Sequence, residues 1–111
     1  MTEFVMVHCA AASAEEAEAI AARLLDRRLA ACVHIVPVVS CYVWKGERAR
    51  EAEHLMIVKT RAERFDDVAE CIRAAHSYDT PEITAAPLTA VDPKYAAWMR
   101  EATAPNLGTA K

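Results

Sequence analysis

Two side chains that could bind a soft metal stand two residues apart in the most apolar stretch of the chain. Cys32 and His34 flank Val33, and residues two apart in a strand lie on the same face, about 6 to 7 Å from each other. A cysteine thiolate favours Cu(I) and, with other ligands, zinc. The spacing indicates a candidate copper site, but a free cysteine is also a common small hydrophobe of protein cores. Both interpretations are open at this point.

Three further cysteines, Cys9, Cys41 and Cys71, form no CxxC pair with one another or with Cys32. This pattern predicts reduced thiols and argues against a zinc knuckle. Packing is the simpler role for Cys9 in an apolar run and for Cys71 beside the apolar stripe of a helix. If Cys9, Cys32 and Cys71 came together, within a protomer or across subunits, they would form a Cu(I) site. Spacing along the chain does not decide whether they meet.

A polar loop carries the second group of side chains that could do chemistry. It reads His-Ser-Tyr-Asp-Thr-Pro-Glu from His76 to Glu82. Imidazole and carboxylate suit zinc or Cu(II), and they also suit proton transfer. The alternative is a structural turn, in which His76 offsets a helix dipole and Pro81 fixes the backbone.

We expect this loop to face a cleft between protomers that holds a small ligand or ion. The residues expected to line the cleft are His76, Tyr78, Glu82, Trp44, Lys45 and Lys59. Trp44 also has a simpler interpretation. Together with Tyr42 it lies near the tip of a predicted hairpin, where aromatic side chains often anchor a subunit interface.

The elements that must position these groups centre on one long β-hairpin. Its strands are residues 31–44 and 53–60, rich in β-branched and aromatic residues, and its tip lies near Lys45-Gly46-Glu47. The first strand would span about 46 Å, whereas a compact domain of this length is about 34 Å across. An apolar ribbon that overhangs its own domain invites association. We therefore predict that other copies of the chain cover it, and we interpret the charged run 47–53 as a solvated arm.

The remaining pattern predicts an α+β fold with the order β-α-β-β-α-β and an appended helix. The signals are a strand at 2–11, a capping box at Ser13–Glu16 with a helix to about Arg28, a second box at Thr60–Glu63 with a helix to about Ala75, a strand at 83–91 broken at Pro87, and a short helix capped by Asp92. This order is that of a ferredoxin-like βαββαβ sandwich with a long central hairpin and an extra C-terminal helix. Residues 1–104 form one domain and residues 105–111 a polar tail.

Composition excludes several classes of function. The net charge is −3 and no Lys/Arg cluster is present, which argues against nucleic-acid binding. Only Gly46 and Gly108 are available, so a glycine-rich phosphate loop is excluded. The chain shows neither a leader pattern nor an apolar run long enough to span a bilayer. We expect a cytoplasmic protein with no membrane partner.

Four motifs in order resemble the CutA divalent-cation-tolerance family. They are Leu29-Ala-Ala-Cys-Val33, Tyr42-x-Trp-Lys-Gly46, Lys59-Thr60 and His76-x-Tyr-x-x-Pro-Glu-Ile83. The resemblance implies a ferredoxin-like protomer similar to the PII signalling proteins, a cytoplasmic homotrimer with intersubunit hairpin contacts, and a link to copper binding and metal tolerance. It places Cys32 at the family's motif cysteine, and Cys9 and Cys71 at positions where some bacterial members carry cysteines. Ala10-Ala-Ala-Ser13 and Ser77 depart from the family's usual loops.

The leading hypothesis is a cytoplasmic homotrimer that binds copper or another divalent metal ion and serves divalent-cation tolerance. The alternative is a PII-like signalling or interaction trimer that binds a small ligand or a partner protein in intersubunit clefts. An enzyme that uses His76 and Glu82 as acid and base is the third reading, and we expect no catalysis because no nucleophile stands beside a base.

Overall fold

The computed structural model describes residues 2–105. The predicted tail, 105–111, lies outside the described residues apart from Pro105. The elements are β1 (Phe4–Ala11), α1 (Ala14–Asp26), β2 (Cys32–Trp44), β3 (Glu47–Arg61), a 3₁₀ turn η1 (Ala62–Arg64), α2 (Phe65–Ala75), β4 (Thr84–Pro87) and α3 (Pro93–Ala102). The α+β class and the predicted element order are confirmed.

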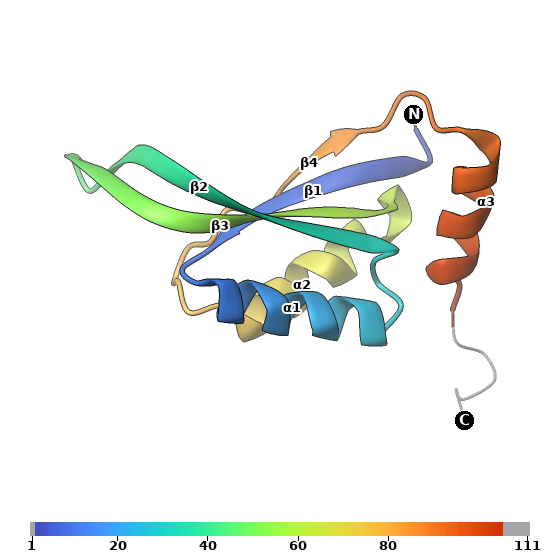
Figure 1. The fold of residues 1–111 in the computed structure, drawn as a ribbon, viewed down its shortest axis with the longest axis horizontal. Coiled ribbons are helices and arrows are strands. Elements are labelled where there is room, and N and C mark those ends of the chain that lie inside the picture. The colour runs from blue at the N-terminus through green and yellow to red at the C-terminus, as the bar shows by residue number, and fades with distance from the viewer. Residues whose placement is uncertain (1, 106–111) are drawn as a thin grey trace.

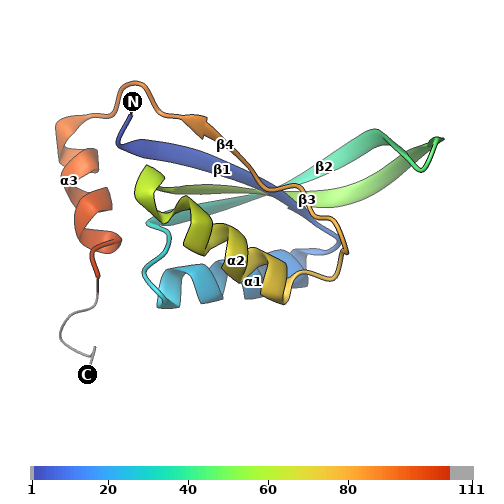
Figure 2. The same ribbon diagram turned by 180° about the vertical axis from the view of Figure 1, so that it is seen from behind.

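The strands form one antiparallel sheet in the order β2-β3-β1-β4. Figures 1 and 2 show α1 and α2 side by side on one face of this sheet. Their apolar stripes meet the alternate residues of β1 and β3 that point toward them. The fully buried members of this core are Val7, Cys9, Ala11, Ala17, Ile20, Leu24, Met56, Val58, Val68 and Ile72. This arrangement is the ferredoxin-like sandwich.

Local signals in the sequence account for most of the element ends. The Ser13 side chain accepts from the Glu16 N–H at 3.1 Å, so it caps α1 as predicted. Asp92 likewise caps α3 by accepting from the Lys94 N–H at 3.0 Å. The second capping box is wrong, because Thr60 lies in β3 and its hydroxyl donates to the Leu29 carbonyl at 2.7 Å. The last strand is shorter than predicted, since β4 ends at Pro87.

The central hairpin is long, as the sequence predicts. β2 and β3 pair continuously from Cys32↔Lys59 to Trp44↔Glu47, and the turn places Lys45 at φ 53° and Gly46 at φ 80°. Two residues with positive φ are the signature of a tight hairpin turn that matches strand twist. β1 pairs with β3 only as far as His54, so the rest of the hairpin projects beyond the sheet. The molecule measures 47 × 33 × 21 Å.

The face of the sheet opposite α1 and α2 is largely uncovered in the described part of the chain. Because directly paired residues share a face, the register assigns to it Met6, His8, Cys32, His34, Val36, Leu55, Ile57 and Lys59. We call these residues the open face. Helix α3 adjoins it at the end of the sheet farthest from the hairpin tip.

The C-terminal helix α3 is held at that end by an apolar contact and by arginines. Met99 and Ala96 pack against Phe4 and Ala31 in a small buried cluster. The last carbonyls of the helix accept from guanidinium groups, which satisfies acceptors that a helix end leaves unpaired. The donors are Arg28, Arg61 and Arg64, and the acceptors are the carbonyls of Glu101, Thr103 and Ala104.

Candidate metal and ligand sites

The sulfur of Cys32 and Nε2 of His34 lie 3.7 Å apart on the open face. Strand β2 places both side chains on the same face, as the spacing predicts. Their Sγ–Nε2 distance is shorter than the distance of about 6 to 7 Å that separates residues two apart in an ideal strand. Cys32 is half-buried and His34 exposed. A soft sulfur and an imidazole nitrogen at this distance could both reach one copper or zinc ion. They would supply part of a coordination shell.

Cys32 also has a phenol beside it. Burial and the Cys32 thiol raise the pKa of Tyr95, which projects from α3. Tyr95 in turn lies against Lys59, whose Nζ is 5.7 Å from the ring centroid. Lys59 was predicted to line a ligand cleft with Trp44, but the structure sets it opposite Cys32 in the strand register, beside α3.

Cys9 and Cys71 lie on the other side of the sheet. Both are buried in the core formed with α1 and α2, and the Cys71 sulfur accepts from Arg27 at 3.8 Å. Burial raises the pKa of Cys9 to about 12, and nearby carboxylates add to the shift. A thiol that holds its proton so firmly is a weak ligand at neutral pH. Within one protomer, therefore, Cys9 and Cys71 do not join Cys32.

A complete metal site is not formed inside the described residues. No three side chains among the His, Cys, Asp and Glu of residues 2–105 are arranged to hold one ion. The fourth cysteine, Cys41, is exposed on the projecting part of the hairpin. Additional ligands for a metal at Cys32 and His34 would have to come from solvent or from another copy of the chain.

His76 has a structural role in holding its loop in place. Its side chain is fully buried, Nε2 lies 2.9 Å from the Ala10 carbonyl, and Nδ1 accepts from the Tyr78 N–H at 3.0 Å. A carbonyl can only accept and an N–H can only donate, so this network fixes the neutral tautomer with the proton on Nε2. Nε2 thus holds the loop to β1, and Nδ1 orders the loop itself.

Glu16 fastens the same loop to the start of α1. Its carboxylate accepts from the Ala12 N–H at 3.0 Å and from the Ser77 N–H at 2.7 Å. Burial acts to raise the pKa of Glu16, but the hydrogen bonds from Ala12 and Ser77 outweigh it, so the pKa lies below its ordinary value of 4.5. The capping-box pattern pointed to a role for Glu16 at the helix start, but not to the contact with Ser77, which is 61 residues away in sequence.

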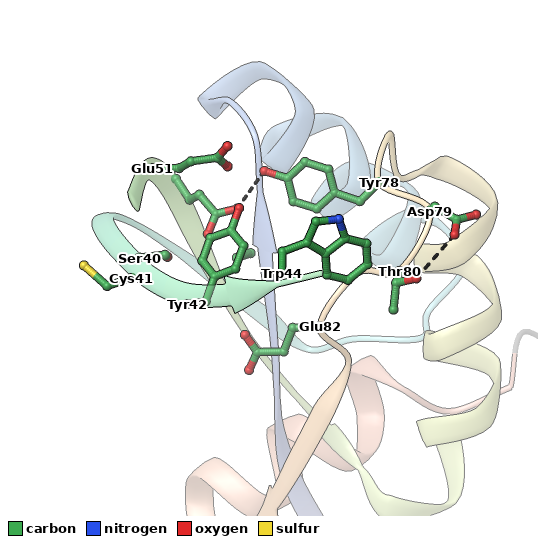
Figure 3. A pocket seen from close by; sticks show the side chains of 11 residues that line it. Ser40, Cys41, Tyr42, Trp44, Glu51, Tyr78, Asp79, Thr80 and Glu82 are labelled. Atoms are coloured by element: carbon green, nitrogen blue, oxygen red, sulfur yellow. Dashed lines mark hydrogen bonds between the residues drawn. The ribbon is translucent and has the colours of Figure 1, made fainter. Parts of the chain in front are cut away.

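The loop and the projecting hairpin enclose a cavity of about 690 Å³ (Figure 3). Its lining is Ala10, Ser40, Cys41, Tyr42, Trp44, Glu51, Glu53, Tyr78, Asp79, Thr80 and Glu82. Of the predicted cleft residues, Trp44, Tyr78 and Glu82 thus meet in one pocket. His76 and Lys45 are not part of the lining, although the Lys45 Nζ is 5.9 Å from the centroid of Trp44.

Glu53 is the carboxylate that sequence analysis misjudged. It was assigned to a solvated arm, yet it is only 6% exposed, and the Tyr78 hydroxyl donates to its Oε2 at 2.6 Å. Burial and this hydrogen bond raise the pKa of Tyr78, so the phenol keeps its proton. The signal that could have found the site is the spacing of Glu51 and Glu53, which places both carboxylates on one face of β3.

These features define a ferredoxin-like α+β protein whose central hairpin extends beyond its sheet. The profile of the CutA1 divalent ion tolerance protein family matches residues 5–102, and the chain belongs to that family. The Divalent-cation tolerance protein CutA of Archaeoglobus fulgidus is 44% identical over 86% of this chain and 93% of its own length. That of Thermus thermophilus is 44% identical over 82% of this chain and 89% of its own.

Solved structures agree with the fold. The periplasmic divalent cation tolerance protein CutA from Archaeoglobus fulgidus superposes with a TM-score of 0.89 at 42% identity, covering 90% of this chain and 98% of that one. CutA1 from Oryza sativa gives 0.88 at 35% identity, covering 92% and 94%. In the described part of this chain, no helix has the length and apolarity needed to cross a membrane.

Proposed function

We propose that this chain serves divalent-cation tolerance as a cytoplasmic homotrimer that binds copper or another divalent metal ion, and that Cys32 and His34 supply its ligands. The observation that carries the proposal is the 3.7 Å separation of the Cys32 sulfur and the His34 Nε2 on the open face. The names of the relatives support the link to divalent cations.

Assembly and metal binding depend on the same surface in this account. The open face exposes apolar side chains such as Val36 next to Cys32 and His34, and large apolar patches favour association. When copies meet across this face, two ligands from each could complete a site that one protomer leaves incomplete. The CutA resemblance supports three copies.

The proposed cytoplasmic location rests on the cysteines. Four free cysteines support a reducing compartment. Cell fractionation with an antibody to the chain would test this location against the periplasmic one named for the Archaeoglobus relative.

The test is a copper titration of the reduced protein against a competing chelator. We expect saturable binding that weakens at least tenfold in Cys32→Ala and in His34→Ala, with folding intact by circular dichroism. Cys41→Ser is the matched control, because Cys41 is an exposed thiol outside the pair. Equal binding by the parent and Cys32→Ala would overturn the assignment of the site.

The second candidate is a PII-like trimer that binds a small ligand. The cavity of about 690 Å³ favours it, since ligand pockets commonly fall between 300 and 1,000 Å³. Acid–base catalysis by His76 has less support, because both of its ring nitrogens are engaged with the backbone. The enzyme hypothesis would be restored by a hydrolase activity of the parent protein that is lost in His76→Ala while folding is retained.

A further inference from the structure

The cavity between the loop and the projecting hairpin has a lining of one charge. Four of its residues are carboxylates, namely Glu51, Glu53, Asp79 and Glu82, and none of the lining residues is Lys, Arg or His. Carboxylates gathered in a concave, partly desolvated surface create a negative potential that concentrates cations and repels phosphates. The ligand class that this pocket excludes is therefore the anionic one.

Three aromatic rings share the pocket with these carboxylates. Figure 3 shows Tyr42, Trp44 and Tyr78 gathered together, with the Glu51 carboxylate above and the Glu82 carboxylate below them in this view. The faces of indole and phenol rings attract organic cations through their quadrupoles. Aromatic faces and dispersed carboxylates together are the combination that recognises a substituted ammonium group.

Glu53 strengthens this interpretation. It is nine-tenths buried in the lining, and the one hydrogen bond found for it in the described part of the chain is the donation from Tyr78 to Oε2. Its Oε1 has no donor there. That oxygen is not itself fully buried, because among residues 2–105 the one buried side-chain polar atom without a partner is Nδ1 of His54. The Oε1 atom can therefore accept a hydrogen bond from a ligand that enters the cavity.

A bare metal ion fits this lining less well. Ions such as Mg²⁺ and Ca²⁺ need several oxygens converging on one point. The described residues contain no such group of three, so the four carboxylates are spread around the cavity rather than focused. Spread acceptors match a larger cation whose charge and N–H donors are themselves distributed.

We propose that this pocket binds an aliphatic organic amine, with Glu51, Glu53 and Glu82 pairing with its ammonium groups and Trp44 and Tyr42 packing on its carbon chain. The inference deepens the second candidate function, that of a ligand-binding trimer, and is independent of the copper site. Cys32 and His34 lie at the opposite end of β2 from Trp44.

The experiment is calorimetric titration of the full chain with putrescine, which is 1,4-diaminobutane. The matched neutral probe is 1,4-butanediol, which has the same chain length without the charges. We expect saturable putrescine binding, at least tenfold weaker in Glu53→Gln and in Trp44→Leu, and no binding of the diol. Glu70→Gln, an exposed carboxylate on α2 outside the lining, controls for net charge and should bind like the parent.

Each alternative outcome of the titration leads to a different conclusion. Absence of saturable binding, or equal binding of the diol, overturns the proposal. Displacement of putrescine by Mg²⁺ at equal or lower concentration reassigns the pocket to a metal. If Glu53→Gln changes the solution mass instead of ligand affinity, another copy of the chain occupies the pocket. If Glu53→Gln folds poorly, Trp44→Leu still tests the proposal. Copper titration of both variants should match that of the parent. This control separates a failure of the amine proposal from a failure of the copper site.

Discussion

The same two strands form two regions with contrasting surroundings. We call residues 32–37 with 54–59 the inner hairpin and residues 38–44 with 47–53 the outer hairpin. In the inner hairpin, β1 pairs with β3 as a third strand, and Met56 and Val58 are fully buried under the helices. In the outer hairpin, Val39 is 57% exposed and Val43 is 67% exposed.

Hydrogen bonding does not distinguish the two regions, because the β2–β3 register is continuous through both. What differs is burial. A two-stranded ribbon without a packed face is marginal in water. Among residues 2–105, Tyr78 covers Glu53 but Val39 and Val43 stay exposed, so we expect the outer hairpin to need a further cover. The contrast teaches that strand pairing sets the shape of the hairpin, whereas burial of its side chains indicates which part of it the proposed assembly would cover.

The largest effect is expected from Met56→Ala in the inner hairpin. Removing this fully buried side chain leaves a cavity under α1 and α2, and we expect the free energy of unfolding to fall by about 2–5 kcal/mol. Urea denaturation at one fixed protomer concentration measures it. Leu25→Ala is the control, since Leu25 is 44% exposed on α1 and should change stability by about 1 kcal/mol or less. Equal losses in both variants would remove the distinction between core and surface.

The next effect concerns the outer hairpin, where we expect a change of assembly with little change in the protomer. The double variant Val39→Asp, Val43→Asp adds two charges to exposed positions, and charge on a covered apolar surface is strongly unfavourable. The mass in solution should fall to that of one chain while the circular dichroism spectrum stays the same. Val39→Thr, Val43→Thr keeps the β-branched shape and should retain more of the assembly. An aspartate variant that assembles like the parent would contradict the comparison.

The smallest effect is expected from Glu16→Gln, which tests the body of the protein away from the hairpin. The folded pKa of Glu16 lies below 4.5, so its ionised form stabilises the fold above that pH, and the stabilisation is lost as pH falls through the folded pKa. At neutral pH we expect Glu16→Gln to unfold more easily by about 0.5–2 kcal/mol. The difference should shrink below pH 4.5. Glu18→Gln, an exposed position on the same helix, is the matched control for the loss of one charge. A gap between the parent and Glu16→Gln that stays constant from pH 7 to pH 3 would contradict the role of the carboxylate.

Periodicity and capping signals were enough to predict the order of the elements. The Ser13 and Asp92 caps form as predicted, because a cap depends on contacts within four residues. The Thr60 box failed because β3 continues through Thr60 and buries its hydroxyl against Leu29. Tertiary pairing overrode a local preference there.

The candidate sites were predicted only in part, for a similar reason. Cys32 and His34 share a strand, so the period of two places them together without knowledge of the fold. The contacts of Tyr78 with Glu53 and of Ser77 with Glu16 join segments 25 and 61 residues apart. No spacing rule reaches across such distances. The solvated reading of Glu53 failed because its burial depends on where the loop returns.

The mass of the reduced protein in solution tests the central claim most directly. If the outer hairpin and the open face are covered by other copies, light scattering at micromolar concentration should give about three times the 12.2 kDa of one chain. A stable species of 12.2 kDa, folded by circular dichroism and unchanged on concentration, would contradict it.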